Sequence, residues 1–266
     1  MNAFASDLDR TLIFSQRMLA AYGSDGNEEC IELLDGKPIS YISPKTKEGL
    51  KEIHEDMCFI PVTTRTIEQY KRIQLFQEDI VPEYAITSNG GTILKRGEVL
   101  KEWTLHVEGM LRNSTPLEEM MKKVTALDDT KWIKKIKPGD GVFFYIILHT
   151  DRFSSERFSE LKKLSDHVGW QMSLQGRKLY FIPKVLTKWT ALRYLREELG
   201  LKDICTAGDS ILDLELITNG TYGIAPLHGE VLEKFPSLHQ TKEAGIKASE
   251  EIVEKVQSRY RNVEAI

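Results

Sequence analysis

The residues best suited to chemistry are two aspartates near the start of the chain, Asp7 and Asp9, followed by Thr11. They come directly after a short apolar stretch. A strand that ends at Asp7 would deliver both carboxylates to the carboxyl edge of a sheet, where open α/β sheets bind their ligands. Two aspartates so close together resist joint ionisation unless a cation offsets their charge. The pattern is weak by itself, because many loops carry two aspartates and a threonine.

A second polar group follows the apolar run 59–62, which leads into Thr63, Thr64 and Arg65. The pattern predicts a strand that again delivers hydroxyl groups to a carboxyl edge, followed by a helix over 66–77. A threonine that only caps the helix is an equally good interpretation.

Lys188 stands just before an amphipathic helix expected over 189–199, which Gly200 ends. A lysine at a helix start is usually a solvated charge, and the helix dipole disfavours it there. This misfit indicates a role that requires positive charge at this position.

The last polar group follows the apolar run 204–207 and comprises Gly208, Asp209, Ser210 and Asp213. At a spacing of four, the two carboxylates are expected on one face of a helix over 210–217. Like charges at this spacing are destabilising, so a bound cation is the economical explanation. An acidic first helical turn, which the dipole favours, is the alternative, and it explains one carboxylate better than two.

Taken together, these segments resemble the haloacid dehalogenase superfamily of phosphatases, in its Cof-like and sucrose-phosphatase-like branch. The matching residues are Asp7, Asp9 and Thr11 of motif I, Thr63 of motif II, Lys188 of motif III, and Gly208, Asp209, Ser210 and Asp213 of motif IV. The segment 87–91, with Asn89 and Gly90, resembles the Asn-Gly segment that this branch carries after its third core strand. The resemblance runs from residue 2 to about residue 256 and is weakest over 92–183.

The resemblance implies an α/β fold, with a Rossmann-like core of parallel strands in the order 5-4-1-2-3 and an inserted α+β cap. The core is expected over residues 1–91 and 184–266, and the cap over 92–183. Periodicity predicts core strands over 2–6, 58–63, 84–87, 204–207 and 221–224, which alternate with helices over 46–56, 66–77, 189–199, 210–217 and 248–259. With motifs I and IV side by side, the four aspartates Asp7, Asp9, Asp209 and Asp213 would share one pocket.

Two further segments have predicted roles. Asp35-Gly36, between apolar stretches 30–34 and 39–42, predicts a hairpin where the family carries a flap, and an ordinary surface hairpin is the alternative. The insert is expected to hold a hairpin over 92–105, helices near 116–126 and 155–168, and strands over 142–148, 170–174 and 178–182. A cap placed there would exclude water and select the leaving group. The basic residues Lys131, Lys134, Lys135 and Lys137 are interpreted mostly as a solvated strand face, and contact with an anionic substrate is the alternative.

The residue types predict a mechanism. Asp7 is expected to attack phosphorus and form an aspartyl-phosphate, while Asp9 donates a proton to the leaving oxygen and later takes one from water. Mg²⁺ is the expected cofactor, because a small hard cation prefers oxygen ligands. Its expected ligands are the carboxylate of Asp7, the backbone carbonyl of Asp9, and Asp209, with Asp213 direct or through water. Thr63 and Lys188 are expected to contact the phosphoryl group, since positioning and charge neutralisation supply most of the catalysis.

Three positions depart from the family pattern, because Arg10, Thr64 and Trp189 stand where glycines are usual. An inward-pointing Arg10 is expected to contact an acidic group of the substrate, the flap or the cap, and an orientation into solvent is an equally good interpretation. The residues expected to bind substrate are Arg10, Thr11, Thr64, Arg65, Asn89 and Gly90.

Composition indicates a soluble cytoplasmic protein. The 266 residues, 41% of them hydrophobic, can form a sizeable core with an insert. A net charge of −4 argues against a nucleic-acid or membrane partner, and the chain shows no apolar run of spanning length and no leader pattern. The three cysteines, Cys30, Cys58 and Cys205, share no metal-binding spacing, which indicates thiols in a reducing compartment.

The sequence thus predicts an Mg²⁺-dependent phosphoric monoester hydrolase that acts on a small phosphorylated metabolite, such as a sugar phosphate, as a monomer or weak homodimer. A phosphomutase with the same nucleophile and a non-catalytic phospholigand-binding regulator are the alternatives. A membrane ion pump with related chemistry is excluded by the missing spans.

Overall fold

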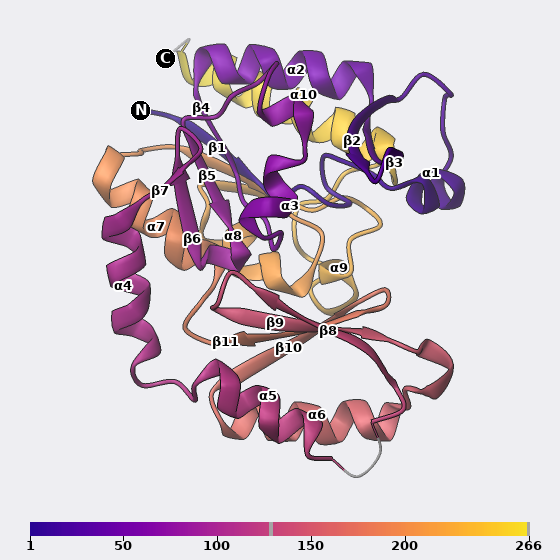
Figure 1. Cartoon of the computed structure of the whole chain (residues 1–266). Coiled ribbons are helices and arrows are strands. Elements are labelled where there is room, and N and C mark those ends of the chain that lie inside the picture. The colour runs from indigo at the N-terminus through magenta and orange to yellow at the C-terminus, as the bar shows by residue number, and fades with distance from the viewer. Residues whose placement is uncertain (128–129, 265–266) are drawn as a thin grey trace. The chain divides into compact units, whose positions relative to one another are not determined.

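The computed structural model of the chain describes residues 1–127 and 130–264, with side chains up to residue 261. The chain forms two compact units (Figure 1). The first unit comprises Met1–Val99 and Lys188–Ile266, and the second comprises Leu100–Thr187. None of the helices in the described part of the chain is both long enough and apolar enough to cross a membrane.

A parallel sheet forms the centre of the first unit. Its strands are β1 (Ala3–Ser6), β4 (Cys58–Pro61), β12 (Ile204–Ala207) and β13 (Tyr222–Ile224), in the order β13-β12-β1-β4. The strands are short and almost entirely buried, as expected for parallel strands covered on both faces. The predicted α/β fold and the order of these four strands are confirmed, and motifs I and IV therefore follow adjacent strands.

Helices cover both faces of this sheet. Helices α2 (Pro44–Asp56) and α10 (Ile246–Glu264) share a core cluster with Phe4 of β1 and Phe59 of β4. Figure 1 shows α7 (Lys188–Leu199) and α8 (Leu214–Asn219) on the other side of the sheet. The short helices α1 (Gln16–Tyr22), α3 (Ile67–Lys71) and α9 (Val231–Lys234) complete this unit.

The expected third core strand, β5 (Tyr84–Thr87), is joined by one parallel bridge, from Ile86 to Val62, the residue that follows β4. Its other edge pairs with β6 (Thr92–Lys95), which pairs in turn with β7 (Glu98–Val99). Residues 92–99 therefore belong to the first unit, and the second unit begins eight residues later than the expected boundary at 92. It also ends at Thr187 rather than at residue 183.

The predicted flap hairpin is present as β2 (Glu29–Leu34) and β3 (Lys37–Ile42). Its turn residues Asp35 and Gly36 have φ values of 51° and 72°, the left-handed pair that a tight two-residue turn requires. Next to the hairpin, the helix expected over 66–77 divides into α3 and a 3-10 turn (Gln74–Phe76). It divides because Ile73 leaves helical geometry and forms an antiparallel bridge with Glu32 of β2.

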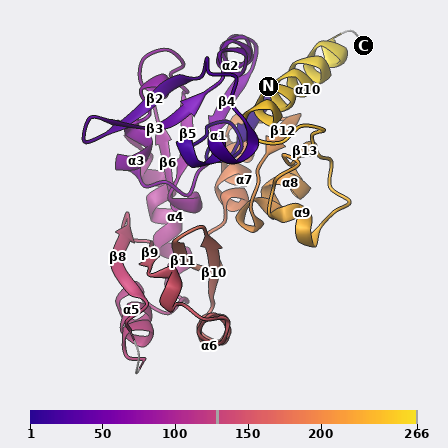
Figure 2. The same ribbon diagram turned by 90° about the vertical axis from the view of Figure 1, so that its right-hand side faces the viewer.

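The second unit is an α+β layer, as predicted for the cap (Figure 2). Its antiparallel sheet contains β8 (Ile133–Gly139), β9 (Phe143–Leu148), β10 (Trp170–Gln175) and β11 (Lys178–Pro183), in the order β10-β11-β9-β8. The helices α5 (Leu117–Thr125) and α6 (Ser155–His167) share their core with Phe144 and Trp170. Residues 100–105 were expected in a hairpin and instead open α4 (Lys101–Leu111), whose buried Trp103 and Val107 are one helical turn apart.

Three lysines of the expected basic cluster, Lys134, Lys135 and Lys137, lie within β8, and Lys131 lies just before it. Pairing sets Lys135 opposite Ile147 and Lys137 opposite Tyr145, so these two lysines lie on the sheet face away from the α5 and α6 core. The three cysteines are free, and burial raises the pKa of Cys58 and of Cys205 to about 11.

Candidate active site

The candidate nucleophile Asp7 lies at the carboxyl end of β1, where its backbone N–H donates to the carbonyl of Ala207 at 2.9 Å. Its side chain is buried and held from two sides. Lys188 Nζ donates to Oδ1 at 2.6 Å, and Thr11 Oγ1 donates to Oδ2 at 3.2 Å. The strand end thus presents one carboxylate whose orientation is fixed by a cation and a hydroxyl.

Lys188 is the first residue of α7, and only 1% of it is exposed. Its ammonium group lies between two carboxylates, 2.6 Å from Asp7 Oδ1 and 2.6 Å from Asp213 Oδ1. Burial alone would lower the pKa of Lys188, but the two aspartates outweigh this effect and raise it. The lysine is therefore charged, and its unfavourable place at a helix start is compensated by direct ion pairs.

The motif IV aspartates Asp209 and Asp213 lie close together, but not on one face of a helix as predicted. Asp209 precedes the helix, and Asp213 ends a 3-10 turn (Ile211–Asp213), so the two do not share a helix face. Ser210 folds the segment, because its backbone N–H and its hydroxyl both donate to Asp213 Oδ2, at 3.0 and 2.7 Å. Gly208 permits the close turn, since a Cβ there would lie 2.3 Å from Asp213 Cβ.

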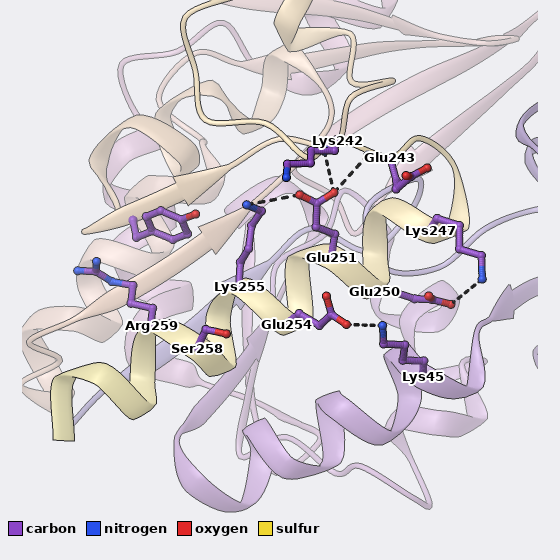
Figure 3. A pocket seen from close by; sticks show the side chains of 11 residues that line it. Lys45, Lys242, Glu243, Lys247, Glu250, Glu251, Glu254, Lys255, Ser258 and Arg259 are labelled. Atoms are coloured by element: carbon purple, nitrogen blue, oxygen red, sulfur yellow. Dashed lines mark hydrogen bonds and ion pairs between the residues drawn. The ribbon is translucent and has the colours of Figure 1, made fainter. Parts of the chain in front are cut away.

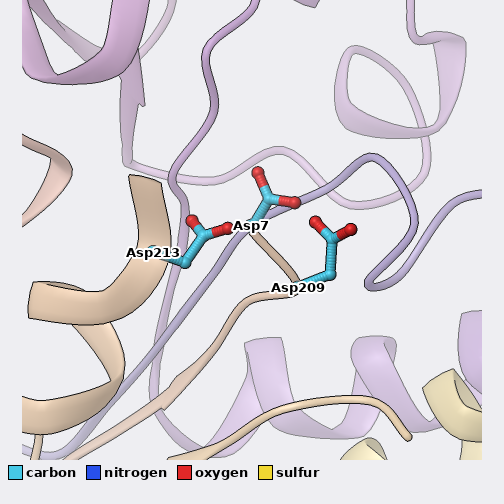
Figure 4. Close-up of side chains that lie close together, drawn as sticks. All are labelled: Asp7, Asp209 and Asp213. Carbon is cyan, nitrogen blue, oxygen red and sulfur yellow. The ribbon is translucent and has the colours of Figure 1, made fainter. Parts of the chain in front are cut away.

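Three carboxylates converge at the end of the sheet, as Figure 4 shows. One oxygen from each of Asp7, Asp209 and Asp213 lies within 4.8 Å of the others. Burial, with a contribution from Asp213 and against the effect of Lys188, raises the pKa of Asp7 to about 7. Burial and the neighbouring carboxylates also raise the pKa of Asp209 well above its ordinary value. The three carboxylates therefore resist joint ionisation unless a further cation is present, and their hard oxygen donors fit a small divalent cation such as Mg²⁺.

Asp9 points to a different partner. Its side chain is half-exposed and receives a two-pronged contact from Arg65, with Nε to Oδ2 at 2.7 Å and Nη2 to Oδ1 at 2.8 Å. Arg65 is thus committed to protein carboxylates, although a substrate contact was expected for it. The expected meeting of all four aspartates is reduced to three, with the Asp9 side chain outside the carboxylate cluster.

The flap supplies the other anchor of Arg65. Nη1 of Arg65 lies 2.7 Å from Oε2 of Glu32, a carboxylate with no exposed surface. Arg72 Nε and Ser40 Oγ also donate to Glu32, at 3.2 and 2.6 Å. The sequence reasoning did not identify this network. The signal available was a glutamate among the apolar residues of a predicted strand, a place where an acid needs a partner.

Motif II and the Asn-Gly segment are joined through their backbones. Thr63 is buried, and its Oγ1 accepts a hydrogen bond from the backbone N–H of Arg65 at 3.1 Å. The backbone N–H of Asn89 donates to the carbonyl of Thr63 at 3.0 Å. Ser88 and Asn89 have φ values of 54° and 55°, a conformation rare for residues other than glycine and concentrated at functional sites. Thr63, Asn89 and the adjacent Gly90 therefore form one buried corner, while Thr64 is only partly buried.

Arg10 points inward but has a protein partner other than the expected flap or cap residue. Its Nε lies 3.0 Å from Asp209 Oδ2, so its acidic partner is a motif IV aspartate rather than a residue of the flap or cap. The interpretation that it points only into solvent is also wrong, because Nε is buried. Trp189, the other large departure near a motif, is partly buried in the first turn of α7.

A cavity of about 960 Å³ lies elsewhere, along α10 (Figure 3). None of the expected site residues lines it. Its charged groups pair with one another, as in the ion pairs Lys45–Glu254, Lys247–Glu250 and Lys255–Glu251. The cavity is a surface groove with compensated charges, and the chemistry of the molecule points instead to the carboxylate cluster.

Comparison with known proteins agrees with this geometry. The sequence profile of the sucrose-6F-phosphate phosphohydrolase family matches residues 2–254. The fold is similar to that of the sucrose-phosphatase from Synechocystis sp. PCC6803, solved with sucrose and phosphate, at a TM-score of 0.68 and 15% identity over 96% of this chain and 97% of that chain. No curated protein matches the sequence.

Two further solved structures share the fold. The HAD subclass IIB sugar phosphatase BT4131 has a TM-score of 0.66 and 15% identity, with 98% of this chain and 99% of that chain covered. A putative HAD/COF-like hydrolase from Plasmodium vivax has a TM-score of 0.63 and 12% identity, with 97% and 96% covered. The profile match spans nearly the whole chain, and the motifs lie at the strand ends where this fold needs them. The chain therefore belongs to the sucrose-6F-phosphate phosphohydrolase family of the haloacid dehalogenase superfamily.

Proposed function

We propose that this protein is an Mg²⁺-dependent phosphatase that hydrolyses a small phosphorylated metabolite, of the sugar phosphate class, through an aspartyl-phosphate on Asp7. The observation that carries the proposal is the pair of contacts that orients Asp7, from Lys188 Nζ at 2.6 Å and from Thr11 Oγ1 at 3.2 Å. Membership of a sucrose-phosphate phosphohydrolase family supports the reaction class. The sucrose-phosphatase of similar fold was solved with sucrose and phosphate, which supports the substrate class.

In the proposed first step, an oxygen of Asp7 forms a bond to phosphorus while the bond from phosphorus to the leaving oxygen breaks. The buried Lys188 stays paired with Asp7 and Asp213, so its positive charge offsets charge that develops on the transferring group. In the second step, water attacks the aspartyl-phosphate, releases inorganic phosphate and restores Asp7.

Asp9 is the proposed proton donor to the leaving oxygen and the proton acceptor from the attacking water. The structure holds its carboxylate against Arg65, on the half-exposed side of the site. The side chain must therefore turn from Arg65 toward the leaving group and take up a proton from solvent before it can donate one. Arg65 is anchored by the buried Glu32 and stays in place as Asp9 turns.

The carboxylates of Asp7, Asp209 and Asp213, with the backbone carbonyl of Asp9, are the proposed ligands of Mg²⁺. A divalent cation bound there would neutralise the charge of the phosphoryl group and orient it for in-line attack. Thr63, Asn89 and Gly90, which form the buried corner, and the adjacent Thr64 are the proposed phosphoryl contacts, because Thr63 and Thr64 follow β4, the strand next to β1.

A phosphate-release screen over sugar phosphates with Mg²⁺, run with wild type and Asp7→Asn, tests the proposal. Wild type should release inorganic phosphate from at least one sugar phosphate, Asp7→Asn should release none, and both should be folded by circular dichroism. Acid-quenched turnover should leave the phosphoryl group on Asp7. A phosphoryl group trapped on another residue would overturn the mechanism, and a wild type inactive on every sugar phosphate would overturn the substrate class.

A further inference from the structure

The backbone of Arg10 is held in an unusual conformation by contacts on both sides. Its φ value is 68°, which a residue with a side chain rarely adopts. Its N–H donates to the carbonyl of Ile13 at 2.8 Å, and its carbonyl lies 2.8 Å from His228 Nε2. The backbone N–H of Gly245 donates to His228 Nδ1 at 3.0 Å, so Nε2 carries the ring proton and donates to Arg10. The surrounding structure thus accepts strain at a position where glycine would have none.

In this backbone conformation, the side chain of Arg10 lies against Asp209. Its Nε is buried and lies 3.0 Å from Asp209 Oδ2, but the N–H is not directed at that oxygen and makes no hydrogen bond. The contact is therefore one of charge, between a guanidinium and a carboxylate of the cluster. Elsewhere the side chain is accessible, with 35% of its surface exposed, so it has a path away from Asp209.

The charges of the cluster show which carboxylate depends on Arg10. Lys188 pairs with Asp7 and Asp213. Among the described residues, Arg10 is the ion-pair partner that the structure gives to Asp209. With both cations present, three carboxylates face two positive charges, and without Arg10 they would face one. A divalent cation should bind the cluster more tightly when Arg10 is absent, because the uncompensated negative charge that attracts it is then larger.

We infer that Arg10 is a built-in counter-ion that competes with the divalent cation for Asp209. It holds Asp209 while the metal site is empty and must withdraw from it for metal to bind, so it weakens metal affinity. This inference rests on the proposed function only in that the carboxylate cluster is taken as the metal site. It assigns control of metal affinity to the residue that replaces the usual glycine of motif I.

Two variants with the same backbone strain test the inference. Arg10→Gln removes the charge and Arg10→Lys retains it, while both keep a side chain at the position of positive φ. Mg²⁺ binding is measured by isothermal titration calorimetry on EDTA-treated protein without substrate, and the Mg²⁺-induced shift in melting temperature is measured in parallel. Arg10→Gln should bind Mg²⁺ about tenfold more tightly than wild type, because one positive charge next to the proposed metal site is lost. Arg10→Lys should stay within about threefold of wild type, since a lysine can still compete for Asp209.

An Mg²⁺ affinity of Arg10→Gln equal to or weaker than that of wild type would overturn the inference, as would equal tightening in Arg10→Lys. Either result would leave the proposed phosphatase intact, provided that wild type binds Mg²⁺ and releases phosphate from a sugar phosphate. A wild type that neither binds Mg²⁺ nor releases phosphate would overturn the proposed function itself. The two failures are therefore distinguishable from the same set of measurements.

Discussion

At the scale of single residues, the site depends on close approaches that only certain side chains allow. Gly208 lies against Asp213, and Ser210 caps the turn that carries Asp213 to Lys188. Each of these residues acts by permitting or fixing the place of a carboxylate. The addition or removal of a single side-chain atom at such a position should therefore lower both the stability of the protein and its turnover.

Gly208→Ala tests this dependence. The added Cβ would stand 2.3 Å from Asp213 Cβ, so the segment must shift and the Lys188–Asp213 pair must lengthen. We expect a loss of about 1–3 kcal/mol in the free energy of unfolding, as in other overpacked sites, and a strongly reduced turnover. Urea unfolding and phosphate release measure the two effects.

Gly109→Ala is the matched control, because a Cβ at that position in α4 would meet no atom within 4 Å. It should raise the free energy of unfolding by about 0.4–1 kcal/mol through a smaller unfolded-state entropy. If Gly208→Ala were as harmless as this control, the close packing of Gly208 against Asp213 would be unimportant.

His228 is expected to make stability depend on pH. Burial and the nearby charge of Arg10 lower the pKa of His228 below the ordinary value of 6.5, against the opposing effect of its hydrogen bond to the carbonyl of Arg10. The folded state therefore binds the proton less readily than the unfolded state. The stability that the neutral ring contributes is present above pH 6.5 and is lost as the pH falls below that value.

Denaturant unfolding of wild type and His228→Asn between pH 5 and 8 measures this contribution. The stability gap between the two proteins should be largest at the alkaline end and should shrink toward the acidic end. A gap that stayed constant, or grew in acid, would show that His228 is not the titrating group.

At the scale of elements, the flap hairpin is tied to the core by charge. Glu32 of β2 has no exposed surface, and it binds Arg65 and Arg72, which flank α3. Because Arg65 also holds Asp9, the position of the proposed acid depends on the hairpin. The β2–β3 element is therefore part of the site rather than an ordinary surface hairpin.

Glu32→Gln should release this element while keeping its shape. Loss of one partner of a buried ion pair costs about 3–5 kcal/mol, so proteolysis and amide exchange should increase within β2 and β3. The control is Glu29→Gln, whose exposed pair with Lys47 should be worth about 0–1 kcal/mol. Equal protection of the hairpin in both variants would contradict the anchoring role.

At the scale of the whole molecule, the carboxylate cluster should link metal binding to stability. Asp7, Asp209 and Asp213 repel one another in a buried place, and a divalent cation would remove that repulsion. We expect Mg²⁺ at 100 times its dissociation constant to stabilise the protein by about 2.7 kcal/mol, with EDTA reversing the effect and abolishing turnover.

Asp209→Ala should lose both the stabilisation by Mg²⁺ and the Mg²⁺-dependent turnover, because it removes one proposed metal ligand and leaves Arg10 without its partner. Differential scanning calorimetry with and without Mg²⁺ provides the measurement. Full turnover by wild type in metal-free buffer would refute the proposed metal dependence.

The sequence determined the fold class and the places of most of the site. Short apolar runs that end in Asp7, Thr63 and Asp209 predict buried parallel strands, whose carboxyl ends meet at one edge. The neighbouring arrangement of β1, β4 and β12 confirms that prediction. These strands could be predicted from the sequence because the burial pattern of a strand and the polar residue after it are local properties of the chain.

The tertiary structure decided which charges meet. Arg10 binds Asp209 across 199 residues of sequence, and Arg65 binds both Asp9 and Glu32. The partner of a long charged side chain depends on backbone conformation, as in the left-handed Arg10, and on elements that are distant in sequence. The unit boundary at Val99 has a similar cause, because β6 and β7 continue the pairing of β5. Sequence patterns record burial and periodicity along the chain, whereas ion-pair partners and the extent of strand pairing are set by contacts that form only on folding.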